Sequence, residues 1–104
     1  MYTFIESPLF TKLVSEYLDD DDLFELQYAI SEKPDAGDVI PGTGGVRKLR
    51  WRMPGRGKRG GLRVIYYLKN VKSEIWLLTL YPKNVAENIP AKVLRKIREQ
   101  IEND

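Results

Sequence analysis

The segment Glu74–Tyr81 dictates the architecture of this chain, because its residues are apolar on both faces of a predicted strand. Such a strand has to be covered on both sides, by helices on each face of its sheet or by an additional layer. A chain of 104 residues can bury one core of this kind and is too short for two. We therefore expect a single domain, residues 1–104.

The N-terminal part of the chain predicts a strand followed by a helix. Tyr2–Glu6 is rich in aromatic and β-branched residues, as strands are. Ser7 and Pro8 then have the residue types of a helix N-cap and of the first helical position. Apolar residues recur at intervals of three and four between Phe10 and Leu18, which is the spacing of one buried helix face.

Four consecutive aspartates, Asp19–Asp22, precede the next apolar stretch. Carboxylates at the start of a helix cap its free amides and interact favourably with the helix dipole. The run lacks the alternating ligands and the glycine turn of a calcium loop, so we favour helix capping over a metal site. The second helix is expected from about Leu23 to Lys33 and ends before Pro34.

The remaining elements follow a connection rich in glycine and proline, Asp35–Gly45. We expect strands at Val46–Met53, Leu62–Lys69 and Glu74–Tyr81, a hairpin turn at Asn70–Ser73 and a last helix at about Pro90–Glu102. A strand, two helices, three strands and a helix pack most economically as an antiparallel sheet with segregated helices. The sequence therefore predicts the α+β class.

Charge is distributed unequally along the chain. Residues 1–38 contain ten acidic and two basic residues, whereas residues 39–104 contain five acidic and fifteen basic ones. Within Val46–Arg63 eight cations occur without an acid: Arg47, Lys48, Arg50, Arg52, Arg56, Lys58, Arg59 and Arg63. Uninterrupted positive charge of this extent indicates a partner that is a polyanion, such as a nucleic acid.

The loop Pro54–Gly61, with the sequence PGRGKRGG, does not fit a nucleotide-binding phosphate loop. Lys58 is followed by Arg59, and the loop leads into a strand rather than a helix. Its glycines instead allow a cationic loop to approach a nucleic-acid backbone closely.

Four cations can converge if the three C-terminal strands are neighbours: Lys48, Arg50, Arg63 and Lys83. The chain has no cysteine and no histidine, which excludes thiolate and imidazole catalysis and the usual zinc ligands. In a nuclease built from cations, a lysine removes the proton of a ribose 2′-hydroxyl, arginines bind the phosphate oxygens and a third group protonates the leaving 5′ oxygen. A basic surface that binds RNA without cutting it is the alternative.

The aromatic residues divide into two groups. Tyr66, Tyr67 and Trp76 lie within strands, where aromatic side chains usually belong to the core or to cross-strand pairs. Tyr81 ends its strand beside Pro82 and can reach a ligand, for example by stacking on a base.

Three segments together resemble the HigB-type toxins of the RelE/ParE superfamily, from bacterial type II toxin–antitoxin modules. They are GDVIPGTGGVRKLRW (Gly37–Trp51), GKRGGLRVIYY (Gly57–Tyr67) and LLTLYPKN (Leu77–Asn84). The resemblance implies a RelE-like α+β fold in which an N-terminal strand and two helices pack on a curved antiparallel sheet, with a C-terminal helix. It also implies ribosome-dependent cleavage of mRNA in the decoding A site, which leaves a cyclic phosphate and inhibits translation.

In that family, cations on the sheet are catalytic groups, and they match Lys48, Arg50 and Arg63, with Lys83 after the last strand. Many of these toxins also have a tyrosine near the C-terminus that stacks on an mRNA base. No aromatic residue follows Pro82 here, so either Tyr81 substitutes for it or cleavage relies on the cations alone. We assign the other cations to ribosomal RNA, where phosphate contacts position the enzyme: Arg47, Arg52, Arg56, Lys58 and Arg59.

The resemblance further implies a cognate antitoxin as protein partner, together with the ribosome and mRNA, and no metal or small-molecule cofactor. Two other functions stay open, a ParE-like inhibitor of DNA gyrase and a non-catalytic RNA-binding module, because a fold does not fix a function. The sequence has no basic N-terminal region followed by an apolar stretch, and no apolar run near the roughly 18 residues of a membrane span. We expect a cytoplasmic protein that does not bind membranes.

Overall fold

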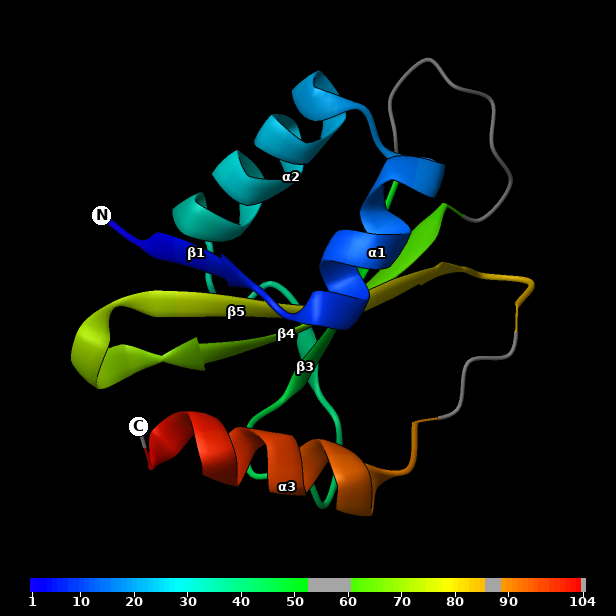
Figure 1. Ribbon diagram of the computed structural model, residues 1–104. Coiled ribbons are helices and arrows are strands. Elements are labelled where there is room, and N and C mark those ends of the chain that lie inside the picture. Colours follow the sequence, from blue (N-terminus) through cyan, green and yellow to red (C-terminus); the bar gives the residue numbers. More distant parts are fainter. Residues whose placement is uncertain (53–60, 86–88, 104) are drawn as a thin grey trace.

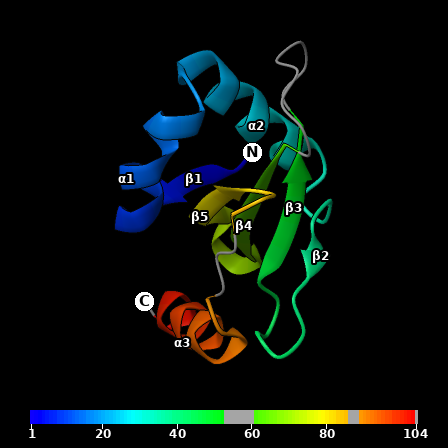
Figure 2. The same ribbon diagram turned by 90° about the vertical axis from the view of Figure 1, so that its right-hand side faces the viewer.

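The structure is a computed structural model that describes residues 1–52, 61–85 and 89–103. Its elements are β1 (Thr3–Glu6), α1 (Pro8–Tyr17), α2 (Asp20–Glu32), β2 (Asp38–Val39), β3 (Arg47–Trp51), β4 (Leu62–Lys69), the 3-10 helix η1 (Asn70–Lys72), β5 (Glu74–Pro82) and α3 (Ala91–Glu102). The strands form one sheet in the order β1-β5-β4-β3-β2. Helices α1 and α2 lie on one side of this sheet and α3 lies on the other (Figures 1 and 2). The predicted α+β class is confirmed.

The sheet is mixed rather than wholly antiparallel. Strands β2 to β5 pair antiparallel, whereas β1 pairs parallel to β5 at the edge of the sheet. The chain passes from β1 directly into α1 and returns to β5 much later, so no hairpin forces these two strands to run in opposite directions. The two-residue strand β2 lies inside the connection that the sequence predicted as irregular, because its pairing with β3 is a tertiary contact without a local pattern.

The predicted N-caps of the first two helices are confirmed by hydrogen bonds. The Ser7 hydroxyl accepts a hydrogen bond from the Phe10 amide at 3.0 Å. At the start of α2, the Asp19 carboxylate accepts from the Asp22 amide at 2.8 Å and the Asp22 carboxylate accepts from the Asp19 amide at 3.2 Å. This reciprocal pair is a capping box, so α2 begins at Asp20 rather than near Leu23.

The acidic run is therefore part of a helix cap. In residues 1–52, 61–85 and 89–103, no group of metal-ligating side chains is placed to hold a metal ion. None of the helices in these ranges is long and apolar enough to cross a bilayer.

Strand β5 is covered on both faces, as its composition requires. On one face, Leu77 and Leu80 belong to a core cluster with Phe10 of α1 and with the buried residues of α2. On the other face, Leu78 packs in a second cluster with Leu94 of α3. A register shift in the β4–β5 pairing makes this possible, since Leu78 is the extra residue between two paired positions of β5.

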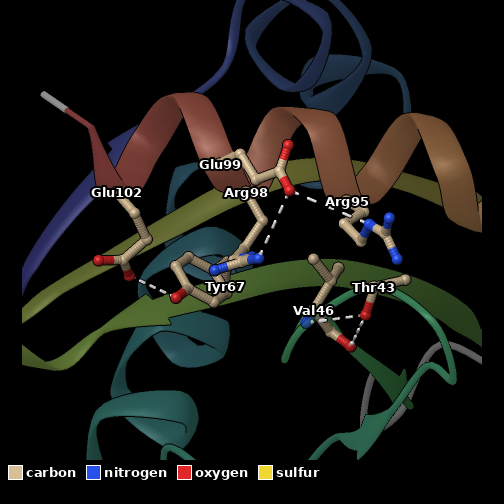
Figure 3. Close-up of polar contacts among 7 residues, drawn as sticks. All are labelled: Thr43, Val46, Tyr67, Arg95, Arg98, Glu99 and Glu102. Atoms are coloured by element: carbon tan, nitrogen blue, oxygen red, sulfur yellow. Dashed lines mark hydrogen bonds and ion pairs between the residues drawn. The ribbon is translucent and has the colours of Figure 1, made fainter.

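Polar contacts from β4 hold the C-terminal end of α3. The Tyr67 hydroxyl donates a hydrogen bond to the Glu102 carboxylate (Figure 3). The ammonium group of Lys69, a residue only 4% exposed, donates to the Ile101 carbonyl at 2.5 Å. A cation at this position also interacts favourably with the negative end of the helix dipole.

The turn between β2 and β3 supports the same helix. The Thr43 hydroxyl donates to the Ile40 carbonyl at 2.7 Å. It also accepts from the Val46 amide at 3.1 Å (Figure 3). Gly44, with φ of 78°, lies so close to α3 that a Cβ there would be 2.7 Å from Nε of Arg98. The turn therefore favours glycine at this position for its left-handed backbone, and a side chain there would also displace the Arg98 guanidinium.

Candidate functional site

Three of the predicted catalytic cations lie on one face of the sheet. Arg50 of β3 pairs directly with Arg63 of β4, and Arg63 pairs with Tyr81 of β5. Residues that are directly opposite on neighbouring strands share a face, with Cβ atoms about 5 Å apart. Lys48 precedes Arg50 by two residues and shares the same face at about 7 Å along the strand. The strands β3, β4 and β5 are neighbours, as convergence of these cations requires.

The three cations line an open hollow, here called the cation hollow, with a volume of about 410 Å³. Its other lining residues are Ala36, Asp38 and Leu49. Lys48 and Arg50 are exposed, and within the part of the chain that the structure describes their side chains have no hydrogen bond or ion pair. Because no hydrogen bond or ion pair with the described residues occupies these two side chains, they can bind an anion such as a phosphodiester.

The chain around Gly37 builds one wall of the cation hollow. The Tyr66 hydroxyl donates to the Pro34 carbonyl at 2.6 Å and accepts from the Gly37 amide at 3.0 Å. The Arg47 guanidinium donates to the Gly37 carbonyl at 2.7 Å. A Cβ on Gly37 would lie 2.9 Å from the Tyr66 ring and 3.1 Å from the backbone of Lys48, so glycine is needed for this close approach.

Tyr66 is therefore a structural residue of the site. Its side chain is fully buried, and the cost of desolvating a phenolate raises its pKa above 10.0. The protonated hydroxyl can donate to one backbone group while it accepts from another, and the observed contacts use both capacities.

Among the described residues, three predicted cations do not line the cation hollow: Arg47, Arg52 and Lys83. Arg47 pairs with Tyr66, on the face opposite to that of Lys48, and its guanidinium is engaged by backbone carbonyls. Arg52 is exposed directly after β3. Lys83 is exposed beyond β5, where its backbone amide donates to the Gly61 carbonyl at 3.2 Å. The predicted RNA-binding residues Arg56, Lys58 and Arg59 lie outside the described residues.

A second hollow, here called the apolar hollow, adjoins the cation hollow and has a volume of about 180 Å³. Lys48 lines both hollows. The remaining lining residues of the apolar hollow are Ile40, Ile65, Thr79, Tyr81, Ile89 and Leu94. Tyr81, the aromatic residue predicted to reach a ligand, thus borders a hollow beside the cations.

Two residues of the site were not selected from the sequence. Asp38 lies opposite Lys48 in the β2–β3 pair, and no local sequence pattern predicts this pairing. Thr79 does have a signal, because it is the single threonine in the otherwise apolar and aromatic segment IWLLTLY. A hydroxyl in a strand that is buried on both faces needs a partner, which makes such a residue a candidate for ligand binding.

No protein-family model matches the sequence. The fold is similar to solved structures of RelE toxins. The free E. coli toxin RelE, as a double mutant, aligns with a TM-score of 0.63 and 16% identity, over 93% of this chain and 96% of that chain. The RelE-like α+β fold is thereby confirmed.

Two further similar structures are toxin–antitoxin complexes. The E. coli RelBE complex has a TM-score of 0.59 and 17% identity, over 85% of this chain and all 100% of that chain. The archaeal RelE–RelB complex from Pyrococcus horikoshii has a TM-score of 0.53 and 24% identity, over 82% and 98%. Structural similarity at identities this low shows a common fold only. The HigB subtype stays a prediction.

Proposed function

We propose that this protein is the toxin of a type II toxin–antitoxin module, of the HigB type, and that it cleaves mRNA in the A site of the ribosome. The observation that carries the proposal is the placement of Lys48, Arg50 and Arg63 around one open hollow on a RelE-like sheet. Three cations around one hollow match the charge of an RNA phosphodiester and of the more highly charged transition state.

Arg50 and Arg63 form the phosphate clamp in this mechanism. They are direct cross-strand partners, so two planar guanidinium groups can bind the non-bridging oxygens of one phosphate. Both stay protonated throughout the reaction. They therefore stabilise the charge that builds on the phosphorane oxygens, a contribution of about 100- to 1,000-fold in rate for one well-placed donor.

Lys48 is the proton acceptor in this mechanism. The described residues that line the cation hollow include one lysine, Lys48, and two arginines. The arginines cannot give up a proton, so Lys48 is the candidate proton acceptor. The Lys48 amine takes the proton of the ribose 2′-hydroxyl, and the 2′ oxygen forms a bond to the adjacent phosphorus while the bond from phosphorus to the 5′ oxygen breaks. The products are a 2′,3′-cyclic phosphate and a 5′-hydroxyl, and no metal ion is needed for either step.

The leaving 5′ oxygen needs a proton, and two residues at the end of β5 can supply it. Tyr81 pairs with Arg63 and borders the apolar hollow, next to Lys48. Lys83 follows two residues later on a long flexible side chain. If Lys83 is the acid, Tyr81 is available to stack on a base of the mRNA.

The remaining cations serve binding to the ribosome in this proposal. The cations assigned to ribosomal RNA phosphates are Arg52, Arg56, Lys58 and Arg59. Arg47 contributes less, since its guanidinium already binds the Gly37 carbonyl. A cognate antitoxin is the proposed protein partner, supported by the toxin–antitoxin complexes among the similar structures, and the cytoplasm is the proposed location.

The proposal is tested with purified protein and ribosomes that carry a defined mRNA. Wild-type protein should cut the mRNA in the A site and leave a cyclic phosphate, and Arg63→Ala should slow cutting more than it weakens ribosome binding. Arg95→Ala, on the exposed surface of α3, is the matched control and should cut normally. Inhibition of gyrase supercoiling without cleavage would instead identify a ParE-like inhibitor.

A further inference from the structure

The apolar hollow contains a buried hydroxyl group without a partner. Thr79 is fully buried, and its Oγ1 has no hydrogen-bond partner among the residues that the structure describes. A buried polar atom in this state lowers the stability of a protein, and it persists where something outside the chain supplies the missing bond. Thr79 is one of the residues that line the apolar hollow, so a molecule bound in that hollow is the candidate partner.

The other lining residues of the apolar hollow indicate the chemical class of that partner. Ile40, Ile65, Ile89 and Leu94 supply aliphatic walls, and Tyr81 supplies an aromatic ring. Lys48 adds one cation to this otherwise apolar lining, which suits a flat, largely apolar ring with polar atoms on its edge. The volume of about 180 Å³ equals that of roughly six water molecules in the liquid, which is enough for a small planar ring.

The position of the apolar hollow relates it to the phosphate site. Lys48 lines both hollows, and the row Lys48, Ile65 and Thr79 runs across three neighbouring strands on one face. Thr79 is therefore two strands from Lys48, about 10 Å across the sheet. That separation is comparable to the reach from a backbone phosphate to the far edge of the base on the same nucleotide.

We propose that the apolar hollow binds one nucleobase of the RNA beside the scissile phosphate, and that the Thr79 hydroxyl hydrogen-bonds its edge. The inference rests on the proposed function for the substrate and adds a specificity-determining residue to it. Bases are read by hydrogen bonds to their edges, whereas phosphate contacts carry no sequence information. Thr79 thus gives the enzyme a base preference at one position that the cations cannot provide.

Two substitutions separate the hydroxyl from the shape of the side chain. Thr79→Val keeps the shape and removes the hydroxyl, whereas Thr79→Ser keeps the hydroxyl. Mapping of cleaved mRNA ends should show that Thr79→Val lowers the base preference at one position by roughly tenfold, as the loss of one hydrogen bond predicts. Thr79→Ser should retain the preference, and the exposed control Thr11→Val should not change it. An unchanged preference in Thr79→Val would overturn the proposal.

A direct binding measurement does not depend on cleavage. The four nucleoside 3′-monophosphates are titrated into the protein while the methyl resonances of Ile65 and Leu94 are followed by NMR, with inorganic phosphate as control. At least one nucleotide should shift these methyls, with roughly tenfold weaker binding in Thr79→Val and unaltered phosphate binding. If none of the four nucleotides shifted these methyl resonances, the proposal would be overturned, even if the wild-type protein cuts mRNA.

Thermal melting supplies the third readout. Thr79→Val should melt at the same or a higher temperature than the wild type, because it removes an unsatisfied buried hydroxyl. A clear loss of stability would mean that the hydroxyl already has a partner in the free protein and would contradict the proposal. Nucleotide binding at the apolar hollow without any cleavage by the wild type would uphold the base site and refute the nuclease function instead.

Discussion

Tyr66→Phe tests whether the Tyr66 hydroxyl holds the wall of the cation hollow. The substitution keeps the buried ring, so no cavity forms, and it removes the group that bridges the Pro34 carbonyl and the Gly37 amide. Gly37 is buried, and an unsatisfied buried donor costs about 1–3 kcal/mol. Pro34 is partly exposed, so its carbonyl can bind water at little cost. We expect a loss of about 2 kcal/mol in the free energy of unfolding.

Urea denaturation measures this loss. With a typical m value for a small protein, the midpoint should fall by roughly 1 M urea with m unchanged. The control is Tyr28→Phe, because Tyr28 is 59% exposed and its loss of a hydroxyl should change stability by less than about 0.5 kcal/mol. If Tyr66→Phe were as stable as Tyr28→Phe, the hydroxyl would not hold the Gly37 wall, and the reasoning would be refuted.

Three further predictions concern pH, salt and proton donation. Burial raises the pKa of both Tyr66 and Tyr67, so the folded protein holds these protons more tightly than the unfolded chain. In urea titrations from pH 8 to 11, the free energy of unfolding should be constant below pH of about 10 and fall above it. The fall should be smaller in Tyr67→Phe. The second prediction concerns binding of a short single-stranded RNA, measured by fluorescence anisotropy at several salt concentrations. The slope of log K against log salt should decrease in magnitude by about 0.7 for each of Lys48→Ala, Arg50→Ala and Arg63→Ala, and by less for Arg47→Ala. Equal changes in all four variants would contradict the assigned roles. Whichever of Tyr81→Phe and Lys83→Ala removes the general acid should slow cleavage by about 100-fold or more, and an mRNA with sulfur in place of the leaving 5′ oxygen should restore the rate in that variant alone.

The parts of the fold that the sequence predicts well are those with a local cause. The cap residues Ser7 and Asp19 mark their helices through side-chain oxygens that accept from the first amides. The strand Leu62–Lys69 was predicted with its observed bounds, because the β-branched, aromatic and leucine residues of Val64–Leu68 lie between turn residues on both sides.

The parts that sequence reasoning misses depend on tertiary pairing. The parallel pairing of β1 and the two-residue strand β2 have no local signature. The same is true of the site: the alternation in β3 predicts which cations share a face, but only the pairing of β2 with β3 places Asp38 beside Lys48. Arg47 was assigned to RNA from its charge alone, whereas its engagement by the Gly37 carbonyl arises from the folded loop.

The most direct test of the proposed function is end mapping of an mRNA that occupies the A site of purified ribosomes. Wild-type protein should produce a single cut in the A-site codon with a 2′,3′-cyclic phosphate end. Arg63→Ala should still bind the ribosome and should cut the mRNA about 100-fold more slowly. Intact mRNA after incubation with folded wild-type protein, or equal cutting by the wild type and Arg63→Ala, would contradict the assignment of the cation hollow as an RNA-cleaving site.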